Sequence, residues 1–134
     1  MKILFVNMQF DPGRVQGAER YIAMLAAGLT TRGHDVAILA GNPAGGAARP
    51  LGAAMHESPR VLHLPSHGWT AVHGLGRREL ADLLARERPD VVHVVNPAHV
   101  GIGALLEARD ARIRSVVTVV DFWWVCPKHT LQHH

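Results

Sequence analysis

The chain has 134 residues, of which 48% are hydrophobic and 19% are charged, and its 14 Lys and Arg against 11 Asp and Glu give a formal charge of +3. This length and composition predict a single folded domain over residues 1–134 and exclude a disordered polyelectrolyte. The basic residues are spread along the chain rather than clustered with aromatic residues, so we expect no nucleic-acid partner.

The apolar segments of the chain are short. None approaches the roughly 20 residues that a helix needs to cross a bilayer. The run at residues 3–6 is too short for the core of a secretory signal, and a single cysteine, Cys126, cannot form an internal disulfide. We therefore expect a cytoplasmic protein.

Short apolar runs alternate along the chain with stretches of helical periodicity. The runs are bounded by Asn, Pro and Gly, as in strands buried on both faces, whereas the longer stretches repeat apolar residues every three or four positions. Strands are expected at residues 2–6, 35–40, 61–64, 90–95 and 115–120, helices at 17–32, 76–88 and around 102–106, and a long loop at 41–59. This alternation predicts an α/β, Rossmann-like fold, a parallel sheet with helices on both faces.

Ligands of such a sheet bind outside the carboxyl ends of its strands. The segments that follow the expected strands are residues 9–17, 41–42, 96–99 and 121–124. We expect the site to be built from these four segments.

The segment before the first helix holds Gly13 and Gly17. Free N–H groups and the helix dipole at this point favour contact with an anion, such as a phosphate, or with a sugar. The spacing is not Gly-x-Gly-x-x-Gly, and residues 40–42 place no acidic side chain after the second strand, so we expect no NAD. A turn that merely requires glycine explains the pattern equally well.

Two further sets of polar residues have simpler interpretations. The ten histidines are scattered over different elements without an i, i+4 pair on an expected helix, so we predict no metal site and no cofactor. Glu79 and Glu87 share the second expected helix with several arginines, which favours a solvated helix face over a pair of reactive carboxylates.

Three segments in order resemble the amino-terminal domain of GT4-type glycosyltransferases, the large retaining family with the two-domain GT-B fold. They are Gly-Ala-Glu-Arg-Tyr at 17–21, Pro-Asp-Val-Val-His-Val at 89–94 and the stretch from 117 to 127 around Asp-Phe-Trp-Trp. The resemblance spans essentially the whole chain. It departs at Val120 and Val95, where histidines are common in the family.

The resemblance implies a metal-independent enzyme that moves a sugar from a nucleotide-sugar donor to a sugar or other small-molecule acceptor. This chain would be its acceptor-side half. The chain stops at His134, so we expect the donor-binding domain to be absent and the chain alone to be inactive.

Asp121 is the candidate catalytic residue, because it matches the family's Asp and can accept hydrogen bonds from sugar hydroxyls at a strand end. Trp123 and Trp124 offer apolar faces for a pyranose ring, although for at least one of them packing in the core or between domains is the stronger interpretation. The remaining candidates for substrate binding are Gly13, Gly17, Ala18, Glu19, Asn96, His99 and Phe122.

Two alternative hypotheses concern surfaces rather than catalysis. The first is a non-catalytic module that binds a sugar or a protein, because valines at residues 116–120 would leave an apolar sheet surface prone to self-association. The second is weak attachment to the inner membrane face through the arginines of the second helix and the residue after it, Arg77, Arg78, Arg86 and Arg88. Interspersed acidic residues dilute that basic patch.

Overall fold

The computed structural model describes residues 1–11, 17–42, 60–65, 77–98 and 102–125. In this part of the chain a five-stranded parallel sheet has the order β3-β2-β1-β4-β5. The strands are β1 (Lys2–Asn7), β2 (Asp35–Asn42), β3 (Arg60–Pro65), β4 (Val91–Asn96) and β5 (Arg114–Val117). The helices are α1 (Ala18–Thr30), α2 (Arg77–Glu87), α3 (Gly103–Asp110) and the single 3-10 turn η1 (Phe122–Trp124).

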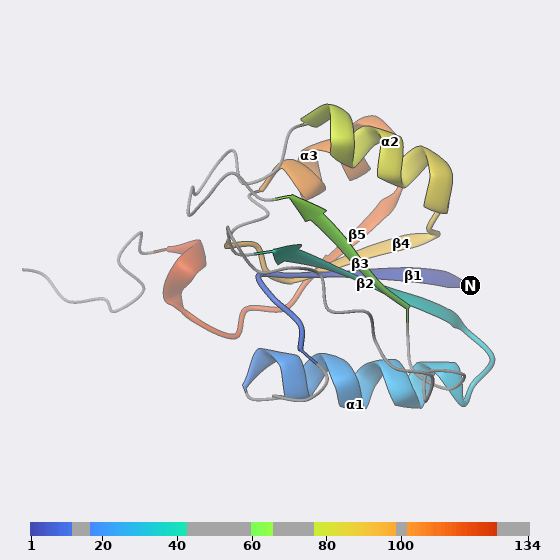
Figure 1. Cartoon of the computed structure of the whole chain (residues 1–134), viewed down its shortest axis with the longest axis vertical. Helices are drawn as coiled ribbons and strands as arrows, with labels where there is room; N and C mark the ends of the chain where they lie inside the picture. The colour runs from blue at the N-terminus through green and yellow to red at the C-terminus, as the bar shows by residue number, and fades with distance from the viewer. Residues whose placement is uncertain (12–16, 43–59, 66–76, 99–101, 126–134) are drawn as a thin grey trace, which may run out of the picture.

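Helices cover both faces of the sheet. Figure 1 shows α1 alone on one face, and α2 and α3 side by side on the other. Strand, helix and parallel strand follow one another as the apolar pattern predicts, which confirms the Rossmann-like α/β fold.

The central strand β1 has a core on each side because alternate residues of a strand point to opposite faces. Leu4 and Val6 pack with the buried leucines of α2, whereas Ile3 and Phe5 pack with Ile22 of α1. Each such fully buried aliphatic side chain contributes about 1.5–3 kcal/mol through removal from water. The two cores hold the strand ends in place on both sides of the sheet.

Strand β5 is shorter than predicted. The expected strand runs to residue 120, but the ladder with β4 stops at Val117, and the backbone N–H of Thr118 makes one further bond to the carbonyl of Val94 at 2.9 Å. All four residues of β5 are exposed. In the described part of the chain this edge has no outer neighbour, so nothing holds residues 119 and 120 extended, and the chain turns into η1.

The solvated-face prediction is right for Glu79 and wrong for Glu87. The Glu87 side chain is 7% exposed, and it lies 2.8 Å from an Arg60 nitrogen and 3.2 Å from Lys2 Nζ. The last turn of α2 meets the amino ends of β1 and β3, from which these cations come. The hydrogen bond from Arg60, followed by that from Lys2, lowers the pKa of Glu87 against the opposing effect of burial.

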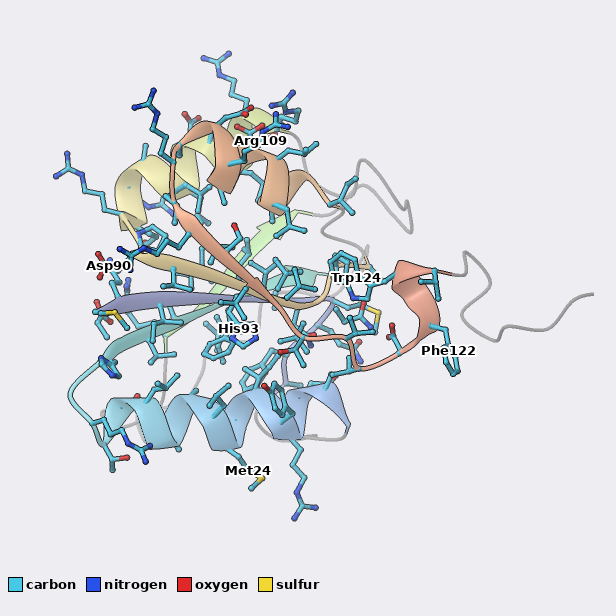
Figure 2. All side chains as sticks on the ribbon, turned by 180° about the vertical axis from the view of Figure 1, so that it is seen from behind. Met24, Asp90, His93, Arg109, Phe122 and Trp124 are labelled. Atoms are coloured by element: carbon cyan, nitrogen blue, oxygen red, sulfur yellow. The ribbon has the colours of Figure 1, made fainter. Side chains whose placement is uncertain are left out.

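The arginines of α2 are partly neutralised. Arg77 pairs with Glu107 and, at 2.9 Å, with Asp110 of α3, and Arg86 lies 3.6 Å from Glu87. Figure 2 shows Arg109 at the same outer side of α2 and α3, where it pairs with Asp110.

Among the residues described, no helix combines the length and the apolar character needed to span a membrane.

Candidate functional site

The carboxyl ends of the central strands open into a pocket of about 580 Å³. Figure 1 shows the start of α1 and the turn η1 at this same edge of the sheet. Residues from β1, β4, α1 and the segment after β5 therefore meet there. The described residues that line the pocket are Asn7, Met8, Gln9, Gly17, Ala18, Glu19, Asn96, Val120 and Asp121.

The structure brings together five of the predicted site residues, from three separate segments. Gly17, Ala18 and Glu19 come from the start of α1, Asn96 from the end of β4, and Asp121 from the segment after β5. Their proximity follows from the parallel sheet, in which neighbouring strands end at the same edge.

Gly17 caps the start of α1 with a backbone that disfavours other residues. Its φ is +51° and its ψ is −118°, while a Cβ built on it would meet nothing within 4 Å. The requirement for glycine is thus conformational rather than steric. Its carbonyl accepts the first helical hydrogen bond, from Tyr21 N at 3.1 Å. The conformation supports the turn interpretation of this glycine, which also lines the pocket, and its contact with an anion or a sugar stays a prediction.

A register shift places two asparagines opposite each other at the carboxyl ends of β1 and β4. The β1–β4 ladder slips between Val6 and Asn7, so that Asn7 pairs with Asn96. Both side chains are buried. A bulge of this kind re-aims the side chains next to it, and here it places two amides at adjacent strand ends.

Asn96 links β4 to the segment after β5. Its Nδ2 donates to Asp121 Oδ2 at 2.6 Å, and its Oδ1 accepts from the backbone N–H of Ala98 at 3.0 Å. Asp121 is half-buried. A carboxylate is therefore presented at the pocket with a donor held against one of its oxygens.

Asn7, Met8 and Gln9 form a part of the lining that was only partly predicted, since the expected site began at Gln9. Asn7 Nδ2 donates to the Gln9 carbonyl at 2.7 Å, and Gln9 Nε2 donates to Glu19 Oε1 at 3.1 Å. Within the described residues, the buried Asn7 Oδ1 has no donor. The sequence signal for Asn7 was available: it is the polar residue that directly ends a buried run at a strand's carboxyl end.

The described lining includes two carboxylates among its hydrogen-bond acceptors. Glu19 and Asp121 contribute carboxylates, and no Lys, Arg or His occurs among the described lining residues. Glu19 already lies in the first turn of α1, where its charge complements the helix dipole. Both carboxylates can accept hydrogen bonds from hydroxyl donors.

Two of the other predicted residues, Phe122 and Trp124, are described and do not line this pocket. Phe122 is half exposed on η1, and Trp124 packs against the core beneath α2 and α3, which agrees with the packing interpretation for one tryptophan. Figure 2 shows Phe122 on the outer side of η1 and Trp124 turned toward the sheet. Gly13, His99 and the side chain of Trp123 lie outside the described part of the chain.

His93 of β4 connects three elements next to the pocket. Its Nε2 lies 2.8 Å from Thr118 Oγ1, which in turn is 3.4 Å from the hydroxyl of Tyr21, so that β4, the end of β5 and α1 are joined. The ring packs on Phe5 with centroids 4.8 Å apart. Burial lowers the pKa of His93, because desolvation disfavours the charged imidazolium. The ring thus links three elements of the fold, and a search of the described residues finds no group of three metal-binding side chains.

Comparison with known proteins gives matches at two levels. The model of Glycosyltransferase Family 4 matches residues 15–132. A GDP-mannose-dependent alpha-mannosyltransferase from Mycolicibacterium smegmatis is 29% identical over 120 residues, which cover 87% of this chain and 31% of that protein. The chain thus spans about a third of the length of this relative.

Solved structures with low identity share the fold. The C-terminal domain of a hydrogenase from Pyrococcus furiosus superposes with a TM-score of 0.56 at 15% identity, covering 87% of this chain and 90% of the other. A UDP-GlcNAc 2-epimerase from Methanocaldococcus jannaschii gives 0.56 at 16% identity, covering 96% of this chain and 35% of the other. These likenesses concern the arrangement of the sheet and helices alone.

Proposed function

Because the chain belongs to Glycosyltransferase Family 4, we propose that its pocket binds sugar hydroxyls during a retaining, metal-independent transfer from a nucleotide sugar to an acceptor. The domain at residues 1–134 would be the acceptor-side half of the enzyme. A second Rossmann-like domain would bind the nucleotide, and the 31% coverage of the mannosyltransferase supports this division of labour.

The observation that carries the proposal is the convergence of Gly17, Asn96 and Asp121 on one acceptor-rich pocket. Sugars present many uncharged hydroxyl donors. In proteins, carboxylates are the strongest hydrogen-bond acceptors for such donors. The two carboxylates of the described lining suit such a neutral ligand.

Asp121 is the residue to which we assign the central role. Its carboxylate would accept a hydrogen bond from a substrate hydroxyl and so hold the sugar in one orientation, while Glu19 would accept from a second hydroxyl. Fixing the reacting groups in this way lowers the entropic barrier of a two-substrate reaction. In a retaining transfer the nucleophile and the leaving group share one face of the donor sugar, and positively charged groups outside the described lining would stabilise the departing phosphate.

The name of the mannosyltransferase relative suggests the probes for a test. We expect the ¹⁵N-labelled chain, titrated with methyl α-D-mannopyranoside and with GDP-mannose, to show amide shifts clustered at Gly17, Glu19, Ala98 and Asp121. GDP alone should leave these amides unmoved. D121N should weaken the response, whereas D82N, an exposed acidic residue on α2, should not. Tight binding of GDP together with no response to either sugar would contradict the assignment.

A second candidate function is a non-catalytic module that associates through its open sheet edge. The observation that favours it is the row of exposed valines along β5 and beyond, with Val116 at 45%, Val117 at 42% and Val119 at 66% exposure. An unpaired strand edge with apolar side chains is prone to pairing with another chain. Sedimentation velocity of the chain would reveal concentration-dependent dimers, and a monomer at all concentrations would rule out this function through self-association.

A further inference from the structure

The orientation of the Asn96 amide is dictated by the backbone. A backbone N–H can only donate, so the N–H of Ala98 requires the oxygen of the Asn96 amide at its 3.0 Å contact. The NH₂ group must then face the other way, toward Asp121 Oδ2 at 2.6 Å. The amide therefore cannot flip without losing both hydrogen bonds.

Burial separates the two partners. Asn96 is 8% exposed, whereas Asp121 is half-buried and lines the same pocket. Both residues line the pocket, and each end of the Asn96 amide already holds one hydrogen bond, so the buried amide is better placed to orient the carboxylate than to bind a ligand. This argues against a direct substrate-binding role for Asn96.

The two residues that directly precede Asp121 are exposed. The β4–β5 ladder ends at Val117, and Val119 and Val120 are 66% and 41% exposed. The hydrogen bond from Asn96 ties this segment to the buried end of β4 and fixes a donor against one oxygen of the carboxylate. Hydrogen bonds to a charged acceptor are short and directional, as the 2.6 Å distance indicates.

We propose that Asn96 is a positioning residue, which aims the Asp121 carboxylate at a substrate hydroxyl rather than contacting the substrate itself. This inference rests on the proposed function, in which Asp121 accepts that hydrogen bond. It assigns the two residues different roles: Asp121 determines whether a hydroxyl is bound, and Asn96 determines where the accepting oxygen lies.

The test uses the full chain, methyl α-D-mannopyranoside as the probe, and two measurements, namely the Kd from NMR titration and the Tm. N96A should raise the Kd about tenfold or abolish binding, because the carboxylate loses its orienting donor. N96D should weaken binding and lower the Tm, since it sets two carboxylates against each other.

The double variant N96D/D121N separates positioning from structural support. It again contains one carboxylate and one amide, so the hydrogen bond re-forms with donor and acceptor exchanged, and Ala98 still finds an acceptor at position 96. We expect the Tm to recover toward the wild-type value while sugar binding stays weak, because the carboxylate now sits at the buried position. D82N serves as the control for loss of an exposed carboxylate.

The outcomes distinguish failure of this inference from failure of the proposed function. If wild type binds the mannoside and folded N96A binds it equally well, Asn96 has no positioning role although the pocket still binds sugar. Recovery of both Tm and binding in the double variant would also overturn the inference, since the position of the carboxylate would then be immaterial. If wild type shows no response to the mannoside or to GDP-mannose, the proposed function itself fails, and the role of Asn96 fails with it.

Discussion

The buried carboxylate of Glu87 should make the stability of the domain depend on pH. Replacing it in E87Q removes the charged partner of Arg60 and the nearer of two carboxylates beside Lys2, which keeps Asp35 at 3.9 Å. Hydrogen bonds to charged groups contribute about 1.5–3 kcal/mol, but exposed ion pairs contribute only about 0–1 kcal/mol. Since Arg60 is 52% exposed and Lys2 27%, we place the loss between these limits, at about 1–2 kcal/mol.

The assay is thermal unfolding followed by circular dichroism at a series of pH values. At pH 7 the loss corresponds to a Tm lower by about 4–8 °C in a domain of this size. The pKa of Glu87 is lowered in the folded state, so its contribution is complete above the ordinary value of 4.5 and is lost as the pH falls through the folded value. The difference between wild type and E87Q should therefore shrink at acid pH, where protonated Glu87 resembles glutamine.

The matched control is E79Q, which removes an exposed glutamate from the first turn of the same helix. It should change the Tm at pH 7 by little, because only a weak helix-dipole interaction is lost. Equal Tm values for E87Q and wild type at pH 7 would refute the reasoning. A difference that persists unchanged at pH values well below 4.5 would refute its electrostatic origin.

Four further substitutions test the fold and the site. G17A should lower the unfolding free energy by about 1–3 kcal/mol, measured in urea, because the backbone conformation at φ +51° is unfavourable for alanine. R112G should raise it by up to about 1 kcal/mol in the same assay, because Arg112 ends α3 at φ +57°. L83A should cost about 2–5 kcal/mol by calorimetry, since Leu83 is 2% exposed. V117K should leave the Tm nearly unchanged and abolish any dimer seen by sedimentation, because Val117 lies on the open edge.

A carboxylate of the pocket, Glu19, lies at the amino end of α1. A helix start beside a glycine turn is a common anion site, and on that ground a phosphate was one of the expected ligands. Glu19 sits in that first turn and receives a hydrogen bond from Gln9, so the positive end of the dipole already faces a carboxylate. A substrate hydroxyl could donate to this carboxylate, in keeping with the acceptor-side role that we propose.

Local pattern alone was enough to predict the order of the elements and the edge that carries the site. Apolar runs bounded by Asn and Pro became β1 and β4, buried on both faces, and Gly33 at φ +80° ends the first helical segment as expected. These properties depend on neighbouring residues and on the parallel sheet rule, both of which are readable from sequence. The meeting of Gly17, Asn96 and Asp121 follows from them.

Contacts between residues far apart in the chain could be decided only by the tertiary structure. Glu87 is buried because α2 ends over the starts of two strands, and Trp124 faces the core because the chain leaves the sheet at Val117. The shift that pairs Asn7 with Asn96 likewise depends on how two strands meet. Periodicity gives the face on which a side chain lies but not its partner, since partners are set by packing between elements, and that packing has no signature in the local sequence.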